Sequence, residues 1–325
     1  MKYKALLIGL GRIGMSYDYT ENSTSDSVVL SHAQALSSHD DFELVGGVDS
    51  CPQQREKFFQ KFKTPVYKTV YEALAIVCPE IVIIATSTAS HLEVCKAVLA
   101  QLKPRLIVLE KPIAYSVDDS YAIIELGKSA GVTIAVNYFR AYEPAHKRLS
   151  EKLSNGFLGF PLTAVVRYTN GMINNGSHWV QYLSAILGDL ETVDMSAHTN
   201  MLADDFSGEV KISFSNGSVY FVPFQSTEYY LFEIDIYGPL GKISIDSSGD
   251  NIKEYLAIPD PAFPSLKILS NEPNITIPAM HQYQRFMYDE IIQFLEGKGL
   301  LSCTTESLFT ALEVYSQLEY QKELK

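Results

Sequence analysis

The chain has 325 residues, of which 46% are hydrophobic and 20% charged, and 38 acidic against 26 basic side chains give a net charge of −12. This length suggests roughly two folded domains with ample core, whereas the acidic balance, without a lysine or arginine cluster, argues against nucleic-acid binding. No stretch approaches the ~18 apolar residues of a membrane span, and the scattered cysteines and missing signal peptide predict a cytoplasmic protein with free thiols.

The first structured element leads into a glycine motif. The apolar run Ala5 to Ile8 reads as a buried parallel strand and enters Gly9, Gly11 and Gly14, which have the G-x-G-x-x-G spacing. The first glycine of such a motif permits a tight turn, the second lets backbone approach a pyrophosphate, and the third lets the next helix pack closely. A plain glycine turn is the alternative. We expect a dinucleotide to contact Gly9, Gly11, Arg12, Ile13 and Gly14.

An acidic residue ends the second expected strand. That strand, Phe42 to Val48, is followed by Asp49, which can bind ribose hydroxyls and repel a 2′-phosphate. Asp49 follows Gly14 by 35 positions, where ~20 is usual, and the polar stretch Tyr17 to Ser27 accounts for the excess. We predict that this stretch lies near the cofactor and partly covers it. No arginine follows Asp49 directly, so the sequence favours NAD over NADP, although a solvated loop aspartate is the alternative.

Strands and helices then alternate as far as residue 138. Such alternation predicts a doubly wound parallel sheet whose ligands bind beyond the carboxyl ends of the strands. The expected elements are a helix near 31–36, helices 52–62, 70–76 and 117–130, and strands 66–67, 81–85, 106–109 and 132–136. The side chains expected at the ligand edge are Thr86, His91, Glu110, Lys111 and Asn137.

From about Phe139 the pattern becomes β-rich. Expected strands cover 162–169, 193–198, 209–214, 219–224, 232–237 and 242–245, and Asn216-Gly217 predicts a hairpin between two of them. Because few helices separate these strands, we expect an open, mainly antiparallel sheet, with helices at 177–187, 282–296 and 305–322. Residues 257–278 read as a loop excursion. The predicted domains are 1–138 and 139–325, with the option that the C-terminal helices pack back on the first domain.

Lys111 is the sharpest candidate for proton transfer. It follows a buried strand, and Pro112 restricts the local backbone. A partly buried lysine can exchange a proton with a hydroxyl or carbonyl. The competing interpretation is a surface lysine paired with Glu110.

The second candidate lies at the start of the helix expected over 177–187. Asn174 and His178 are four positions apart and share a face if the helix has begun. A histidine there can act as an acid, a base or a hydrogen-bond donor, although a lone histidine is more often structural. The histidines show no metal-ligand spacing, and we propose no metal. Further side chains that could bind hydroxyl or phosphate groups are Tyr138, Arg140, Tyr142 and Arg167.

Together these motifs, in this order, resemble the Gfo/Idh/MocA oxidoreductases. They are the Gly9 to Gly14 loop, the segment Ala85 to His91, Glu110-Lys111-Pro112 and the late glycine–histidine segment. The resemblance implies a Rossmann domain, a C-terminal α/β domain with an open sheet that binds substrate and forms a homodimer or homotetramer, and hydride transfer between a nicotinamide and a sugar or cyclitol carbon.

The same resemblance assigns roles to particular residues. Lys111 matches the family's catalytic lysine and His178 its late histidine, while Asn174 and Gln181 stand where the family often has aspartates. The asparagine resembles the branch that oxidises nucleotide-linked sugars, so we expect NAD(P)-dependent oxidation of a sugar, nucleotide sugar or cyclitol. The expected substrate contacts are Lys111, Tyr138, Arg140, Arg167, Asn174 and His178. A non-catalytic sugar or cofactor sensor on the same scaffold is the alternative.

Overall fold

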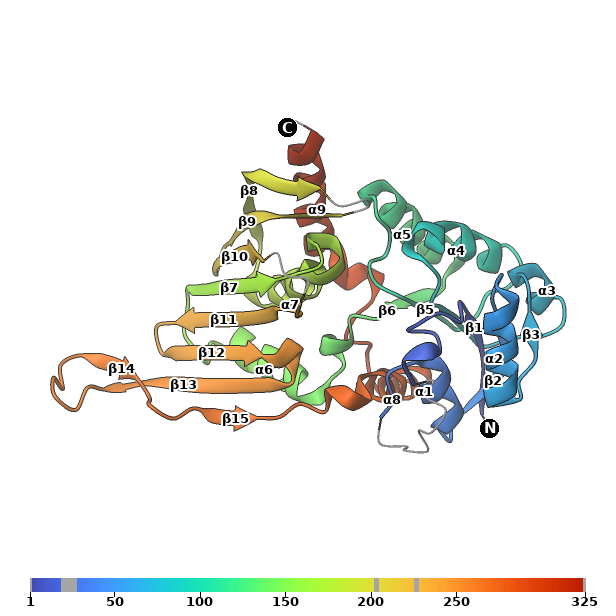
Figure 1. The fold of residues 1–325 in the computed structure, drawn as a ribbon, viewed down its shortest axis with the longest axis horizontal. Coiled ribbons are helices and arrows are strands. Elements are labelled where there is room, and N and C mark those ends of the chain that lie inside the picture. The colour runs from blue at the N-terminus through green and yellow to red at the C-terminus, as the bar shows by residue number, and fades with distance from the viewer. Residues whose placement is uncertain (1, 19–27, 202–204, 225–227, 324–325) are drawn as a thin grey trace. The chain divides into compact units, whose positions relative to one another are not determined.

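In the computed structural model the chain forms two units, each built on its own β-sheet (Figure 1). The structure describes residues 2–18, 28–201, 205–224 and 228–323. The first unit contains Met1–Tyr142 and His281–Ser307, and the second contains Glu143–Met280 and Leu308–Lys325. The boundary is therefore not a single cut near residue 138, because one segment from the C-terminal part of the chain returns to the first unit.

The first unit has a parallel sheet with the strand order β3-β2-β1-β4-β5-β6. Strands β4 and β5 are fully buried because helices cover both faces, which explains their unbroken apolar sequences. The order reverses between β1 and β4, and ligands of such sheets bind beyond the carboxyl ends of the strands at this point. The strands are β1 (Tyr3–Ile8), β2 (Phe42–Val48), β3 (Val66–Tyr67), β4 (Ile81–Ile84), β5 (Leu106–Leu109) and β6 (Thr133–Val136). This arrangement confirms the expected doubly wound sheet.

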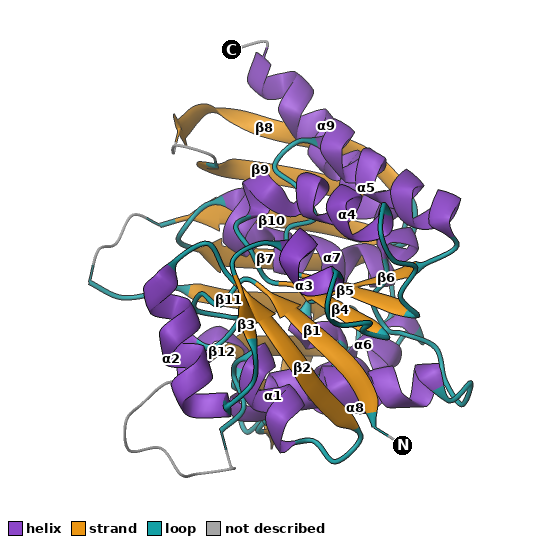
Figure 2. Ribbon diagram, turned by 90° about the vertical axis from the view of Figure 1, so that its right-hand side faces the viewer, coloured by secondary structure: helices purple, strands orange, loops and turns teal. Residues whose placement is uncertain are grey.

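Helices lie on both faces of this sheet. Figure 2 shows α4 and α5 on one side and α1 and α8 on the other. Hydroxyl side chains accept from backbone N–H groups at three helix starts, namely Ser31, Thr69 and Ser116. The helices are α1 (His32–Ser38), α2 (Pro52–Phe62), α3 (Val70–Leu74), α4 (His91–Leu99), α5 (Val117–Ala130) and α8 (Tyr283–Leu295).

The polar stretch after the glycine motif interrupts a helix. The amides of His32 and Ala33 donate to the carbonyls of Ile13 and Gly14, so α1 continues the turn that begins at the glycines. The buried Asp18 carboxylate accepts from the amides of Leu30 and Ser31, which ties the two ends of the interruption together. Because α1 is hydrogen-bonded directly to the residues of the glycine motif, the segment between them is an insertion. This insertion explains why 35 positions, rather than about 20, separate Gly14 from Asp49. Of the stretch Tyr17 to Ser27, residues 19–27 lie outside the described residues.

The second unit has a mixed, mainly antiparallel sheet with the order β14-β13-β12-β11-β7-β10-β9-β8, and β15 also pairs with β13. Among the described strand pairs of this second sheet, only β7 and β10 are parallel. Ser215 and Asn216 link β9 to β10 in the expected hairpin. The strands are β7 (Leu162–Tyr168), β8 (Leu190–Met201), β9 (Phe206–Phe214), β10 (Gly217–Pro223), β11 (Phe232–Gly238), β12 (Gly241–Asp246), β13 (Asn251–Pro259), β14 (Lys267–Leu269) and β15 (Asn274–Thr276).

Three helices accompany this sheet: α6 (Pro144–Ser154), α7 (Ser177–Leu187) and α9 (Phe309–Glu323). Helix α7 packs on the apolar face through Trp179 and Phe232, whose rings lie 5.3 Å apart, and contacts α6 and α9. The opposite face carries the alternate, half-exposed side chains of the strands. Among the helices of the described residues, none is long and apolar enough to cross a membrane.

One expectation for this unit was wrong, and one of its helices was not predicted. Residues 257–278 are not a simple loop, because they include the end of β13, all of β14 and all of β15. The short strands were not predicted because the segment is rich in proline, serine and asparagine, which are rare in strands. Their extended conformation depends on pairing with β13, which the local sequence does not reveal. Helix α6 was missed as well. It starts where Glu143 accepts from the amide of His146 and Pro144 occupies the first turn.

Candidate functional site

The glycine motif forms a tight loop after β1. A Cβ built on Gly9, which has φ +95°, would lie only 2.7 Å from the amide nitrogen of Thr86, and one built on Gly14 would clash with the Gly9 carbonyl. A Cβ on Gly11 would meet nothing within 4 Å. Gly9 and Gly14 therefore serve the packing of the loop, whereas the open space over Gly11 suits a pyrophosphate approaching the backbone. The geometry of the loop fits a dinucleotide.

Asp49 lies at the carboxyl end of β2, beside this loop. One carboxylate oxygen accepts from the amide of Leu10 at 2.8 Å and the other from the amide of Cys51 at 2.8 Å. An ionised carboxylate has about four acceptor positions, so acceptor capacity remains for ribose hydroxyls. Asp49 is therefore more than a solvated loop residue, because it fixes the orientation of the glycine loop.

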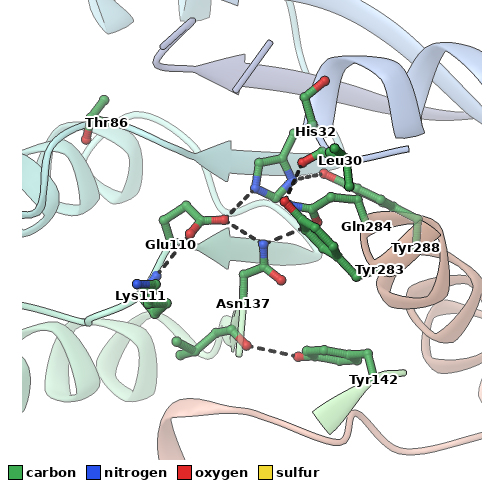
Figure 3. A network of polar contacts seen from close by, with 12 residues as sticks. Leu30, His32, Thr86, Glu110, Lys111, Asn137, Tyr142, Tyr283, Gln284 and Tyr288 are labelled. Atoms are coloured by element: carbon green, nitrogen blue, oxygen red, sulfur yellow. Dashed lines mark hydrogen bonds and ion pairs between the residues drawn. The ribbon is translucent and has the colours of Figure 1, made fainter. Parts of the chain in front are cut away.

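Glu110 is the centre of a buried polar network at the carboxyl end of β5 (Figure 3). Its Oε1 accepts from His32 Nε2 at 2.9 Å and from Asn137 Nδ2 at 2.6 Å, and its Oε2 lies 3.3 Å from the amide nitrogen of Lys111. Burial raises the pKa of Glu110, but the bonds from His32 and Asn137 and the charge of Lys111 outweigh burial and hold it below its usual value. The carboxylate therefore fixes the turn that carries Lys111.

Helix α8 completes the network from the far end of the chain. Tyr288 Oη lies 2.7 Å from His32 Nδ1, Tyr283 Oη donates to the carbonyl of Leu30 at 2.8 Å, and Asn137 Nδ2 donates to Gln284 Oε1 at 3.2 Å. Burial and, second, the Glu110 charge raise the pKa of Tyr288 well above 10. The segment 281–307 thus supports the ligand edge of the first sheet.

His91 joins two loops at this edge. Its Nδ1 lies 2.9 Å from the carbonyl oxygen of Ile113, and its Nε2 lies 3.3 Å from that of Thr86. Burial lowers the pKa of His91, although its hydrogen bonds oppose this effect, and the neutral ring has one N–H to donate. Because the side chain is fully buried, the structure does not support the direct cofactor contact expected for His91. Thr86 is half-buried and accepts from Ser90 Oγ at 2.9 Å.

The residues after β6 are buried rather than open to solvent. Tyr138, Arg140 and Tyr142 are each no more than 4% exposed. The guanidinium of Arg140 lies 4.7 Å from the centre of the Phe139 ring, and Tyr142 donates to the carbonyl of Cys303 at 2.7 Å. Tyr142 therefore anchors the returning C-terminal segment, a structural role that the sequence did not predict.

Asn174 and His178 lie at the start of α7 in the second unit. The condition for a shared α-helical face is not met, because Met172–Gly176 form a π-helical turn and α7 begins at Ser177, where the helix was expected. Such turns are wider than α-helical ones and are frequent at functional sites. Asn174 is exposed, whereas the His178 side chain is buried and its ring lies 6.0 Å from that of Phe232.

Asp205, which the sequence did not reveal, holds this turn. Its carboxylate accepts from the amides of Ile173 at 2.8 Å and Asn174 at 2.9 Å, and it fills the space beside Gly171. Burial raises the pKa of Asp205, although the amide hydrogen bonds oppose that effect. No local pattern links Asp205 to Asn174, since 31 positions separate them.

Two further polar side chains of the second unit, Arg167 and Gln181, lie in surroundings that the sequence did not predict. Arg167 is on the sheet face opposite α7, where it pairs with Asp235 at 2.9 Å and Glu233 at 3.4 Å, so the structure does not bring it together with His178. Gln181 is 8% exposed, and its Oε1 has no hydrogen-bond partner among the residues that the structure describes. The same residues contain no group of three or more histidine, cysteine, aspartate and glutamate side chains that could hold a metal ion.

Comparisons with known proteins agree with this geometry. The GFO_IDH_MocA model, described as an oxidoreductase family with an NAD-binding Rossmann fold, matches residues 3–138. A myo-inositol 2-dehydrogenase from Thermotoga maritima is 24% identical over 274 residues, which cover 76% of this chain and 75% of the relative.

Solved structures share the fold over almost the whole chain. The WlbA dehydrogenase from Bordetella pertussis, in complex with NADH and UDP-GlcNAcA, has a TM-score of 0.75 at 18% identity, covering 98% of this chain and 95% of that one. A putative NADPH-dependent oxidoreductase from Desulfitobacterium hafniense has a TM-score of 0.78 at 17% identity, covering 100% and 96%. The resemblance inferred from the sequence is confirmed over residues 3–138, which match the model of the Gfo/Idh/MocA oxidoreductases with an NAD-binding Rossmann fold.

Proposed function

We propose that the protein is an NAD-dependent dehydrogenase that oxidises a CH–OH group of a sugar, with a nucleotide sugar as the favoured substrate. The observation that carries the proposal is Lys111, placed at the carboxyl end of β5 on a turn that the buried Glu110 carboxylate holds. In a parallel sheet of this order, that edge is where the cofactor and substrate meet.

The cofactor would be held by the loop of Gly9, Gly11 and Gly14 and by Asp49, and when bound it supplies the hydride acceptor at the nicotinamide. Asp49 supports NAD over NADP, because a carboxylate at this place accepts from the ribose hydroxyls and repels a 2′-phosphate. Arg55, the nearest basic side chain along α2, donates to the backbone carbonyls of Asp49 at 2.6 Å and Ser50 at 3.0 Å. It is therefore engaged and is not poised to bind a phosphate.

Lys111 is proposed to accept the proton of the hydroxyl that is oxidised, because a lysine amine can act as a base when it is neutral. His178 and Asn174 are proposed to bind and orient the sugar. An asparagine cannot take a proton, but its amide can both donate to and accept from hydroxyls. These roles place the substrate contacts proposed for the second unit in the π-helical turn Met172–Gly176 and at the start of α7.

The relatives support a sugar substrate. The curated relative acts on myo-inositol, and the WlbA dehydrogenase structure contains UDP-GlcNAcA. Both are polyhydroxylated rings, and an exposed Asn174 beside a buried His178 offers polar groups suited to such a ring. The nucleotide-sugar preference rests on Asn174 in place of aspartate.

We further propose that the protein works in the cytoplasm as a homodimer or homotetramer through the open face of the second sheet. On this face Tyr220 and Tyr237 are each 40% exposed, and alternate residues of β7, β11 and β12 are half-buried rather than fully solvated. Exposed tyrosines of this kind are enriched at protein interfaces.

The test combines substrate screening with one substitution. The protein is mixed with NAD and a panel of sugars, cyclitols and nucleotide sugars, and reduced nicotinamide is followed by fluorescence. We expect turnover with at least one nucleotide sugar, and Lys111→Met should abolish turnover while NAD binding is retained. Retained turnover in this variant would remove Lys111 from the mechanism. NAD binding without turnover on any substrate would favour the second candidate, a sugar or cofactor sensor, which Asn174 in place of aspartate supports.

A further inference from the structure

The turn between β2 and α2 is held by the side chains of Asp49 and Arg55. The Asp49 carboxylate accepts from the amide of Cys51 at 2.8 Å. Nη1 of Arg55 donates to the backbone carbonyls of Asp49 at 2.6 Å and of Ser50 at 3.0 Å. Arg55 ends the first turn of α2, and helical side chains point back toward the amino end of their helix, so its guanidinium reaches the turn that precedes α2.

One peptide unit connects the contacts of these two side chains. The carbonyl of Ser50, which accepts from Arg55, and the amide of Cys51, which donates to Asp49 Oδ1, belong to the same peptide. A trans peptide is planar, so its carbonyl and its N–H point in fixed and opposite directions. Holding the Ser50 carbonyl therefore sets the direction in which the Cys51 amide donates. Because the second carboxylate oxygen accepts from the amide of Leu10, both oxygens of Asp49 have a fixed orientation.

We propose that Arg55 is a positioning residue for the cofactor, because it keeps the Asp49 carboxylate turned toward the ribose hydroxyls of NAD. This inference rests on the part of the proposed function in which Asp49 binds the ribose. Within the described part of the chain, the guanidinium makes no ion pair with the Asp49 carboxylate, and its hydrogen bonds reach this residue through the backbone.

Two other roles of Arg55 lead to different results. A guanidinium that binds a 2′-phosphate directly would favour NADP, and one that only stabilises α2 would affect every dinucleotide equally. The positioning role concerns the 2′-hydroxyl, because a carboxylate accepts from this hydroxyl and repels a phosphate in its place. The three roles are separated by comparing NAD with NADP and with 2′-deoxy-NAD, whose adenosine lacks the hydroxyl.

Three variants and a control isolate the contact. Arg55→Met removes every donor and keeps much of the apolar stem, whereas Arg55→Lys keeps one charged donor group. Asp49→Ala removes the carboxylate that Arg55 positions. The control is Arg105→Met, because Arg105 also donates to a backbone carbonyl at 2.6 Å, that of Leu295, but precedes β5 and lies at the amino end of that strand.

The experiment is a calorimetric titration of the whole protein, which gives Kd for NAD, 2′-deoxy-NAD and NADP. We expect the wild type to prefer NAD over 2′-deoxy-NAD. This preference should fall about three- to tenfold in Arg55→Met, because a hydrogen bond to a charged group contributes about a factor of ten or more. The Kd for 2′-deoxy-NAD should stay near its wild-type value.

The other variants should follow from the same contact. Arg105→Met should keep the wild-type preference, and Arg55→Lys should lie between Arg55→Met and the wild type. In the Asp49→Ala background, adding Arg55→Met should not change the preference any further, because the group that it positions is already gone.

Several outcomes would overturn the proposal. They are a wild-type preference in Arg55→Met, the same loss of preference in Arg105→Met, an equal loss of affinity for NAD and 2′-deoxy-NAD, and a selective loss of affinity for NADP. If Arg55→Met does not fold, Arg55→Lys compared with the wild type decides the question.

The titrations need no substrate, so failure of the proposed function is seen separately. Absence of turnover on every sugar would refute the proposed dehydrogenase and leave the binding result standing. Wild-type affinity for NAD in Asp49→Ala would refute the ribose role of Asp49, and the positioning role of Arg55 would fall with it.

Discussion

The glycine loop allows a paired prediction, because Gly11 and Gly14 are needed for different physical reasons. In Gly14→Ala the new methyl group would clash with the Gly9 carbonyl oxygen and lie 3.1 Å from the carbonyl carbon and 3.3 Å from Leu10 Cα. All three neighbours are backbone atoms and cannot turn aside. Forcing a methyl group into such a site costs about 1–3 kcal/mol.

In Gly11→Ala the same methyl group meets nothing within 4 Å, and the φ of Gly11 is not positive. The substitution should therefore leave the fold intact or stabilise it by up to about 1 kcal/mol, because alanine restricts the unfolded chain. The methyl group would, however, occupy the space through which a pyrophosphate reaches the backbone. We expect the affinity for NAD to fall at least about tenfold, or about 1.4 kcal/mol.

The assays are thermal unfolding without cofactor and a titration of NAD followed by calorimetry. For a unit of this size, 1 kcal/mol corresponds to about 2–4 °C in Tm, so Gly14→Ala should unfold several degrees lower and Gly11→Ala should not. Wild-type NAD affinity in Gly11→Ala would refute the assignment of this loop to the pyrophosphate. An unchanged Tm in Gly14→Ala would refute the packing argument.

Three further results are expected. Burial raises the pKa of Cys95 and Cys303 to about 12, so Ellman's reagent at pH 8 should titrate only the other two cysteines in the native protein and all four in urea. Burial lowers the pKa of His91 in the folded state, so the contribution of His91 to stability is present above pH 6.5 and is lost as the pH falls below that value. The free energy of unfolding in urea, measured against pH, should therefore depend less on acid in His91→Gln than in the wild type. An unaltered pH dependence in this variant would contradict the reasoning. Asp205→Asn puts an amide against backbone donors and should cost about 1–3 kcal/mol in the unfolding of the second unit. A loss of less than 0.5 kcal/mol, which is about the scatter of neutral surface changes, would show that Asp205 does not hold the turn.

Local patterns in the sequence were sufficient for the first sheet. The strands Phe42–Val48 and Leu106–Leu109 and the helices Pro52–Phe62 and Val117–Ala130 have the predicted bounds. Apolar runs, helix caps and glycines act within a few residues, so their effect on the backbone can be read without the rest of the chain. The same locality explains why the ligand-edge residues after β4, β5 and β6 could be named in advance.

Only the tertiary structure decided how those residues are supported. His32 and Glu110 are 78 positions apart, Tyr288 is 256 positions from His32, and Asp205 is 31 positions from the amide of Asn174 that it holds. Contacts at such separations depend on how strands and helices pack, and no periodicity in the sequence encodes them.

The side chains of Arg167 and His91 show the same limit. Whether Arg167 points to the helices or to the open face depends on the register of β7, where both Val165 and Val166 could have been the buried position. For His91, the sequence predicted a cofactor contact at the ligand edge, but the ring is buried there and contacts the backbone carbonyls of Ile113 and Thr86. The sequence by itself therefore determined where the chain turns at the ligand edge, while long-range packing decided which polar groups face one another there.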